Sequence, residues 1–215
     1  MIALRCVTKR YGFGTPAPPH DVSLAATIRA SPVLMAALRA AREVDAPDWL
    51  LSAGAIRDAV WDAFHDRAPA PPRDVDVGFF DPDDLTPKRD RAIEDALRAL
   101  APRVPWEAKN QAAVHLWYPR SFGFEVPPFQ RTAGAVATFP ETATCVGVRL
   151  LPDDDLLVVA PHGLDDLLDC VCRHNATRVP ADFYERRVAE KGWRERWPRM
   201  RYLPATASPA PAPPR

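Results

Sequence analysis

This sequence has little glycine, little cysteine and no net charge. Among its 215 residues there are 9 Gly and 4 Cys, and 28 basic side chains balance 28 acidic ones. A formal charge of zero excludes a strongly basic nucleic-acid binder, so we expect no DNA partner and no attraction of the whole molecule to an anionic membrane. Four cysteines at this length do not form a disulfide framework, and we expect reduced thiols.

Long apolar runs and several well-known motifs are also absent from the sequence. No stretch approaches the ~20 apolar residues that span a bilayer, and the opening MIALRCVTKRYGFG lacks the apolar segment of a signal peptide. There is no Gly-x-Ser-x-Gly motif, Walker loop, zinc quartet or dinucleotide fingerprint. We therefore expect a cytoplasmic protein without membrane contact, outside the enzyme classes that these motifs mark.

Proline, by contrast, is abundant, and much of it lies towards the two ends of the chain. Residues 1–26, which include TPAPPH, are expected to form a loosely attached arm, and the Pro/Ala stretch 204–215 a disordered tail. With 47% hydrophobic residues overall, the intervening stretch 27–203 can bury a core. We expect one domain there, with a core over 27–125 and a C-terminal part over 126–203.

Helix and strand signals alternate through the first half of that domain. Ser31-Pro32 and Thr86-Pro87 are typical helix starts, with helices expected to run to about Asp45 and to Leu100, whose side chain should face inward. Apolar or alternating segments predict strands at 49–51, 74–80 and 106–110, and a hairpin over 144–160. Further helices are expected at 55–66, 132–139, 163–172 and 182–191. The pattern predicts an α/β (α+β) protein with a compact mixed sheet, flanking helices and a helical C-terminal part.

Two aspartates alternate with apolar residues in the strand expected at 74–80. Because alternate side chains of a strand share a face, Asp74 and Asp76 should project to one side while Val75, Val77 and Phe79 enter the core. Two adjacent carboxylates repel each other unless a cation lies between them, and Mg²⁺ prefers such oxygen ligands. The other two Asp-x-Asp triplets fall in turns, so this pair is the candidate metal site.

The second candidate is the small-residue turn Ser52-Ala53-Gly54, which joins a strand to a helix. Small residues let a ligand approach the backbone, and the free N–H groups at a helix N-terminus favour an anion. The segment therefore predicts either a phosphate-binding turn or a plain strand-to-helix connection.

Together these two segments resemble the polymerase β-like nucleotidyltransferase superfamily. The order of Ala53-Gly54-Ala55-Ile56-Arg57-Asp58, a helix, and an Asp-hydrophobic-Asp-hydrophobic strand is similar to the Gly-Gly-x-Val-Arg-Asp form of tRNA CCA-adding enzymes and bacterial poly(A) polymerases. Further segments resemble an uncharacterised bacterial family of small nucleotidyltransferase-like proteins over about residues 27–203: WEAKNQ at 106–111, FPETAT at 139–144, APHGLDDL at 160–167 and KGW at 191–193.

The resemblance implies a catalytic site with bound Mg²⁺ (or Mn²⁺). By position, Asp74 and Asp76 would be catalytic metal ligands, and Glu107 on a neighbouring strand would be the third carboxylate, with Asp81 as the alternative for that place.

The resemblance also places Ser52, Ala53 and Gly54 at the triphosphate. Ala53 stands where the CCA-type motif has its first glycine, so Ala53→Gly should admit phosphates more closely and, by freeing the backbone, lower stability slightly.

Three charged residues complete the implied nucleotide site: Arg57, Asp58 and Lys109. An Arg-Asp pair in the first turn of a helix fits a local salt bridge equally well. Farther along, residues 173–201 carry nine Lys/Arg against four Asp/Glu, a composition typical of a solvated helix or of a surface that meets phosphates. Trp193 and Trp197, four residues apart there, indicate a packed helical face rather than a platform for bases.

These observations lead to one function and a rival. The first is a Mg²⁺-dependent nucleotidyltransferase that moves NMP from an NTP to an unidentified acceptor hydroxyl and releases pyrophosphate. The chain lacks room for long helical tRNA-binding lobes, so the acceptor can be a small molecule, a protein or RNA. The rival is a nucleotide-binding module of the same fold without turnover, in which the turn with Ala53 no longer supports transfer.

Overall fold

The apolar alternation that begins at Val75 forms a central strand of a mixed sheet. The computed structural model describes residues 4–5 and 23–205. Its main sheet has six strands in the order β1-β6-β5-β2-β3-β4, and β3 runs antiparallel to β2 and parallel to β4. A separate parallel pair joins β7 to β8. The strands are β1 Leu4–Arg5, β2 Leu50–Ser52, β3 Val75–Phe79, β4 Trp106–Asn110, β5 Gly147–Leu150, β6 Leu156–Val159, β7 Val171–Cys172 and β8 Arg201–Tyr202.

The helices begin largely where the capping residues predict. The Ser31 hydroxyl accepts the Leu34 N–H at 3.4 Å with Pro32 at the first helical position, and the left-handed Asp45 ends that helix. The α-helices are α1 Leu24–Ala30, α2 Pro32–Val44, α3 Gly54–Phe64, α4 Pro87–Leu100, α5 Val114–Phe122, α6 Thr132–Val136, α7 Asp165–Leu168, α8 Ala181–Lys191 and α9 Trp193–Arg196, with 3₁₀ turns η1 Gln111–Ala113 and η2 Thr142–Thr144.

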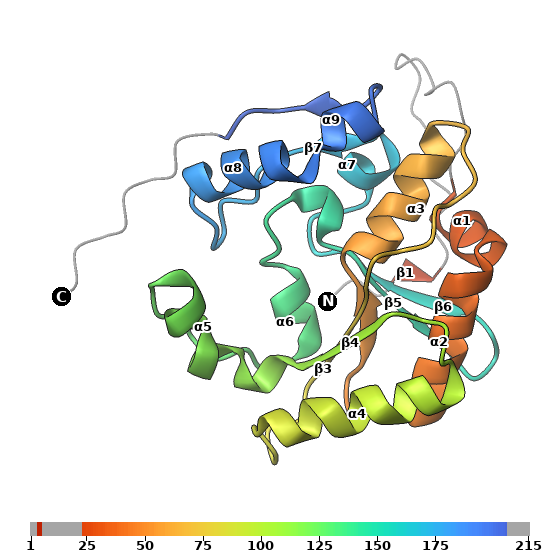
Figure 1. Cartoon of the computed structure of the whole chain (residues 1–215), viewed down its shortest axis with the longest axis vertical. Coiled ribbons are helices and arrows are strands. Elements are labelled where there is room, and N and C mark those ends of the chain that lie inside the picture. Colours follow the sequence, from red (N-terminus) through yellow and green to blue (C-terminus); the bar gives the residue numbers. More distant parts are fainter. Residues whose placement is uncertain (1–3, 6–22, 206–215) are drawn as a thin grey trace.

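The sheet lies between two sets of helices. Figure 1 shows α2 and α3 on one side of it and α5 and α6 on the other. Val75, Val77 and Phe79 face the first set and are at most 2% exposed, so the main core lies there. The two faces of β3 are therefore chemically different, as the alternation predicts.

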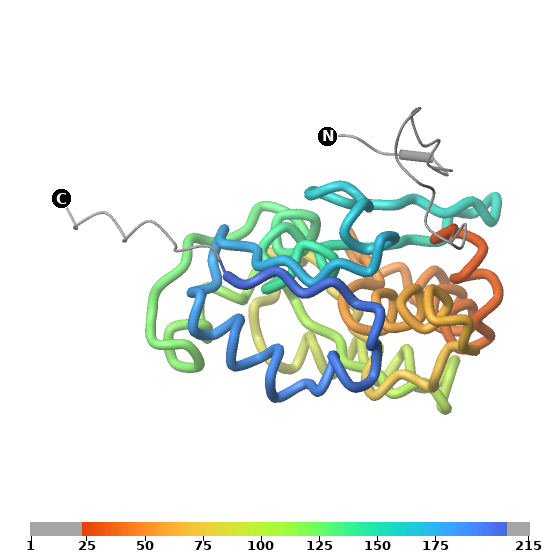
Figure 2. Tube along the Cα trace, turned by 90° about the horizontal axis from the view of Figure 1, so that it is seen from above, coloured from red at the N-terminus to blue at the C-terminus, as the bar shows by residue number. Residues whose placement is uncertain are grey.

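The C-terminal helices close one end of the molecule. Figure 2 shows α8, in blue, running from the α5 segment towards α3, and the contact between the Phe122 and Phe183 rings, 5.9 Å apart, joins α5 to α8. Trp193 and Trp197 are buried edge-on against Trp61 of α3, with centroids 6.0 and 5.1 Å away. This confirms the expected packed face.

Three sequence expectations were wrong. Residues 114–122, where no helix was expected, form α5 with Pro119 inside it. The helix expected over 163–172 is limited to Asp165–Leu168, because Cys170 has a positive φ of 52° and the chain then enters β7. Leu100 is 52% exposed, since it ends α4 at the outermost strand of the sheet.

Part of the N-terminal arm expected over residues 1–26 is described. Leu4–Arg5 pairs with β6, and α1 begins at Leu24 after the N-cap Ser23. Residues 1–3 and 6–22, and those after residue 205, lie outside the described residues. Within the described ranges, no single helix has the length and apolar composition to cross a membrane, and α1 and α2 meet those criteria only when joined across a bend of 92°.

Candidate active site

The strand register brings three of the expected site residues into one row. Asp76 pairs with Ser52 on β2 and with Glu107 on β4, and side chains at paired positions point to the same face of a sheet. Neighbouring strands lie ~4.8 Å apart, so these side chains are neighbours. Asp74, two residues earlier, shares the face and is exposed, whereas Val75 is fully buried. We call Ser52, Asp76 and Glu107 the Asp76 row.

Electrostatics connects the carboxylates of this face. The pKa of Asp76 is raised from 3.8 to about 7, first because the carboxyl is partly buried and then because Asp74 and Glu107 are close enough to repel its charge. Arg187 and Arg57 act in the opposite direction. The site thus favours either a proton or a cation at Asp76.

Asp81, the alternative third carboxylate, is turned away from this row. Its position continues the buried set of Val75 and Phe79 rather than the opposite face, which carries Asp74 and Asp76. Its carboxylate accepts hydrogen bonds from Arg89 Nε at 2.7 Å and from the backbone N–H of Asp83 at 3.2 Å. Glu107, not Asp81, is the carboxylate beside Asp76.

The turn after β2 has an unusual backbone at Ala53. Its φ of 64° and ψ of −135° lie in a region that glycine adopts freely and that a β-carbon strains. The Ala53 N–H is anchored to Val146 O at 3.4 Å, and α3 begins at the next residue. The first N–H groups of α3 have no partner within the helix, so this end of the helix favours an anion.

The turn also lies against the carboxylates. A β-carbon built on Gly54 would come within 4.0 Å of Asp74 Oδ1 and 3.8 Å of Arg57 Nη2. A ligand with both a metal-binding group and phosphates could therefore contact the Asp76 row and the turn together.

Arg57 and Asp58 form the local salt bridge that was one of their two interpretations. Arg57 is 4% exposed, and its Nη2 lies 2.6 Å from Asp58 Oδ1 while its Nη1 donates to Thr144 Oγ1 at 2.9 Å. Its guanidinium covers the Trp193 ring at 4.2 Å, and Asp58 also binds Arg196 Nη1 at 2.9 Å. Through these contacts, Arg57 and Asp58 hold α3 against α9. Contact of either residue with a nucleotide stays a prediction.

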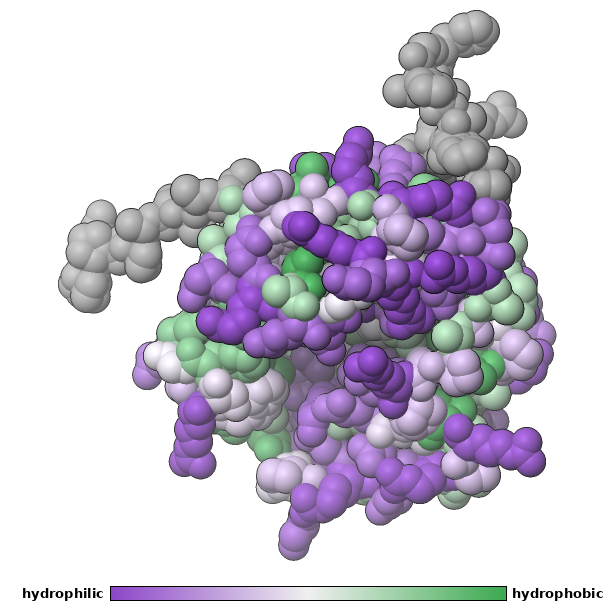
Figure 3. All heavy atoms as spheres, turned by 45° about the horizontal axis from the view of Figure 1, so that its top comes forward, coloured by the Kyte–Doolittle hydropathy of each residue, from purple (hydrophilic) through white to green (hydrophobic). Residues whose placement is uncertain are grey.

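A cavity of about 300 Å³ opens over the Asp76 row. Its sheet side is lined by that row together with Ala53 and Lys109. Its helical side is aromatic, with rings from α5, from α8 and from the segment between α5 and α6: Trp117, Tyr118, Phe122, Phe129 and Phe183. We call this set the aromatic wall. In Figure 3 the surface is mostly hydrophilic, and green side chains gather at the left, over α5.

Sequence reasoning missed two arginines of the cavity, Arg178 and Arg187. The Arg178 guanidinium lies 4.6 Å from the Tyr118 ring centroid and 4.5 Å from that of Phe129. Arg187 Nε donates to Glu141 Oε1 at 2.7 Å. The one signal for the aromatic wall was the density of rings in residues 117–124, and nothing local marked the two arginines.

The cysteines behave as ordinary thiols. Cys145, Cys170 and Cys172 are free and buried, and burial raises the pKa of each to about 12, which keeps the thiols protonated near neutral pH. Cys6 lies outside the described residues.

The carboxylates fit a divalent cation by their chemistry. In the described part of the chain, no three His, Cys, Asp or Glu side chains are already gathered as a metal cluster. Asp74, Asp76 and Glu107 offer the oxygen donors that Mg²⁺ prefers, and the repulsion that raises the pKa of Asp76 is what a cation would relieve.

Comparison with known proteins agrees with this geometry. The family model described as nucleotidyltransferase matches residues 39–202, a range that contains the turn, both aspartates and Glu107. The chain belongs to this nucleotidyltransferase family. A solved structure described as the NMR structure of a protein that reveals a CCA-adding enzyme head domain is 30% identical, with a TM-score of 0.69, over 84% of this chain and 94% of that one. Comparison with curated proteins gave no match.

For this member of the nucleotidyltransferase family, the polymerase β-like resemblance and the mixed α/β fold are confirmed. The narrower likeness to a bacterial family of small proteins stays a prediction.

Proposed function

We propose that the chain is a Mg²⁺-dependent nucleotidyltransferase that moves NMP from an NTP to an acceptor hydroxyl and releases pyrophosphate. The observation that carries the proposal is the Asp76 row, which lies beside the N-terminal turn of α3 and faces one cavity.

Each part of the site has a role in the proposal. Asp74, Asp76 and Glu107 would hold the cation, Mg²⁺ or Mn²⁺, and once bound it would lower the pKa of the acceptor hydroxyl and neutralise the leaving phosphates. The backbone of Ser52 to Gly54 would bind the triphosphate, with Lys109 on the same side of the cavity. In the reaction, the acceptor oxygen would form a bond to the α-phosphorus of the NTP. The bond between the α-phosphorus and the oxygen that bridges it to the β-phosphate would break, pyrophosphate would leave with that oxygen, and the hydroxyl proton would pass to solvent.

For the acceptor, we favour a small molecule. The aromatic wall suits a flat ring, of the acceptor or of the nucleotide base, because stacking on aromatic side chains contributes about 1–3 kcal/mol per ring in nucleic-acid complexes. Four of the nine basic residues in 173–201 already form ion pairs within the chain: Arg173, Arg187, Arg196 and Arg199.

Ala53 keeps the second candidate function open. Ala53 has a glycine-type backbone conformation, and its β-carbon would narrow the approach of a phosphate to the turn, which favours binding of a nucleotide without turnover.

The deciding experiment follows the label from α-³²P-NTPs, with Mg²⁺ or Mn²⁺, in cell extract. Transfer of label by the parent and not by Asp76→Asn supports the enzyme. Metal-dependent NTP binding without transfer supports the binding module. A protein that binds no NTP with either cation contradicts both.

A further inference from the structure

Arg187 reaches the cavity from α8, on the helical side of the site. It lines the same cavity as Ser52, Asp76 and Glu107, although more than a hundred residues of sequence separate it from the turn. The positive charge of Arg187 acts to lower the pKa of Asp76, against the larger effects of burial and of Asp74 that raise it. A cation in this place faces whatever anion the carboxylates and their metal bind.

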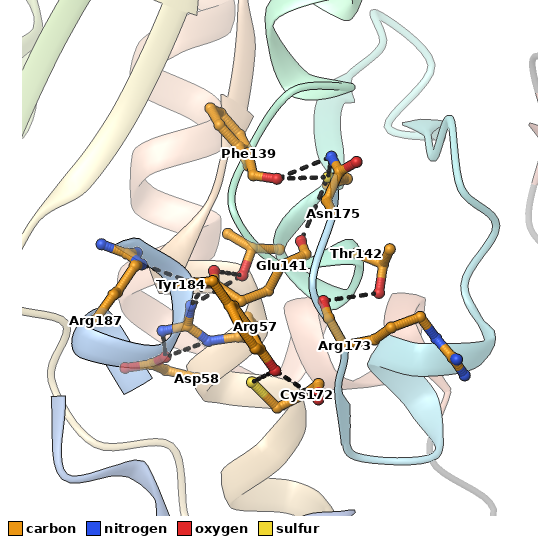
Figure 4. Close-up of polar contacts among 12 residues, drawn as sticks. Arg57, Asp58, Phe139, Glu141, Thr142, Cys172, Arg173, Asn175, Tyr184 and Arg187 are labelled. Atoms are coloured by element: carbon orange, nitrogen blue, oxygen red, sulfur yellow. Dashed lines mark hydrogen bonds and ion pairs between the residues drawn. The ribbon is translucent and has the colours of Figure 1, made fainter. Parts of the chain in front are cut away.

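Arg187 is held by a carboxylate that water does not reach. Glu141 is 0% exposed, and it accepts hydrogen bonds from Arg187 Nε at 2.7 Å and from Thr144 Oγ1 at 2.9 Å (Figure 4). An ionised group is buried at a high cost unless it is paired and hydrogen-bonded, so this contact fixes the guanidinium strongly.

The same glutamate ties Arg187 to the phosphate-binding turn. Arg57, in the first turn of α3, lies 3.8 Å from the other Glu141 oxygen and donates to Thr144 Oγ1 at 2.9 Å (Figure 4). Arg57 is itself neutralised by Asp58 at 2.6 Å. Glu141 thus binds Arg187 of α8 and also contacts Arg57 of α3, so it holds α8 close to the N-terminus of α3.

The outer nitrogens of Arg187 are unused. Glu141 occupies Nε, and among residues 4–5 and 23–205 neither Nη atom of Arg187 has a hydrogen-bond acceptor. The side chain is 28% exposed. A guanidinium that presents two N–H₂ groups to a cavity matches the oxygens of a phosphate, which it can bind through two parallel hydrogen bonds.

We propose that the Nη groups of Arg187 bind the β- and γ-phosphates of the nucleotide, with Glu141 as the positioning residue. The inference rests on the proposed function, because it assumes an NTP at the turn. It adds a binding group from α8 to a site otherwise built from β2, β3, β4 and the start of α3.

Arg186 provides a matched control on the same helix. It has the same charge one residue earlier and also lies over a ring, Phe183 at 5.8 Å, as Arg187 lies over Trp193 at 5.6 Å. Unlike Arg187, it lines an adjoining cavity of about 160 Å³ and not the cavity over the Asp76 row. Its loss changes the net charge of α8 as the loss of Arg187 does, without removing a group from the site.

The test compares binding of an α,β-methylene NTP analogue and of NMP, both with Mn²⁺, by calorimetric titration. Arg187→Gln should weaken NTP binding about 10-fold or more, as expected for loss of charge-assisted hydrogen bonds, and change NMP binding less than about 3-fold. Arg187→Lys should recover part of the lost affinity, because it restores the positive charge but not the two parallel hydrogen bonds of a guanidinium. Arg186→Gln should bind both ligands as the parent does.

Glu141→Gln tests the positioning role. It should weaken NTP binding like Arg187→Gln, and the double variant should lose no more than either single one, because both changes remove the same contact. If Glu141→Gln does not give a cooperative thermal melt, the Arg187 variants decide alone. Equal loss for NTP and NMP in Arg187→Gln, or none, overturns the inference and leaves the proposed function standing. A parent that binds no NTP overturns both.

Discussion

At the residue scale, Ala53 has the sharpest consequence. Its φ of 64° and ψ of −135° strain a residue with a β-carbon by about 1–3 kcal/mol. The sequence predicts that glycine lowers stability here, by roughly 0.5–1 kcal/mol of backbone entropy. The strain is the larger effect, so we expect Ala53→Gly to melt a few degrees higher than the parent and to bind an NTP analogue more tightly.

Calorimetric melts and titrations of Ala53→Gly measure both effects. Gly54→Val is the control, because its side chain would fill the space between the turn and Asp74 Oδ1, 4.0 Å from the added β-carbon, and should weaken NTP binding strongly. A lower melting temperature for Ala53→Gly would show that the turn is not strained. A Gly54→Val protein that binds NTP as tightly as the parent would show that the phosphates lie elsewhere.

Asp76 makes a second prediction, about pH. Its pKa rises from 3.8 to about 7 on folding, so between these values the folded state holds a proton that the unfolded state has lost. The contribution of this carboxyl to stability is therefore full below about pH 4 and falls as pH rises to about 7. Without divalent cations, Asp76→Asn should melt higher than the parent at pH 8, and the difference should vanish towards pH 4.

Added Mn²⁺ should act in the opposite direction at pH 8. It should raise the melting temperature of the parent and not that of Asp76→Asn, because the variant lacks one of the metal-binding carboxylates. Equal Mn²⁺ affinity in the two proteins, measured by calorimetry, refutes the metal assignment.

At the element scale, α5 supplies much of the aromatic wall and can be followed by fluorescence. Of the six tryptophans, all within the described ranges, only Trp117 is exposed, at 40%. Acrylamide should therefore quench mainly Trp117, and a nucleotide bound with its base on the wall should protect it. Inorganic tripolyphosphate should not protect it, since it has no ring. A Trp117→Phe protein should show little quenching with or without ligand.

Local signals predicted most elements because they act over few residues. Ser31-Pro32 and the alternation around Val77 each fix a helix start or a strand without help from distant residues. The helix α5 was missed because Pro119 disfavours a helix locally. The contacts around it, including the tilted rings of Tyr118 and Phe122 with centroids 4.3 Å apart, accompany the helix nevertheless.

The candidate site shows where local reasoning stops. The shared face of Asp74 and Asp76 follows from the period of a strand. The neighbour relation of Asp76 and Glu107 depends on the register of two strands, which the family resemblance supplied and no local pattern contains. Arg187 reaches the cavity through the packing of α8, held by a buried glutamate, and only the three-dimensional structure reveals it.

At the scale of the whole molecule, Asp62 joins the first half of the chain to the last described elements. Its carboxylate is 3% exposed and accepts hydrogen bonds from Trp197 Nε1 at 2.8 Å and Arg196 Nη2 at 3.0 Å. Asp62→Ala leaves the buried indole N–H of Trp197 without its partner and Arg196 with Asp58 alone, so we expect about 3 kcal/mol of destabilisation in denaturant titrations. Asp66→Ala, which removes an exposed ion pair with Arg199, should cost under about 1 kcal/mol.

The parallel pairing of β7 with β8 also sets the order in which the protein can be completed during synthesis. The ribosome makes the carboxylates and the turn early, whereas Arg201–Tyr202 is added near the end of the described chain and is needed to close the β7–β8 pair. Between them the chain runs through α8, which carries Arg187. A nascent chain stalled before residue 200 would therefore contain every carboxylate of the site while the β7–β8 pair is still open.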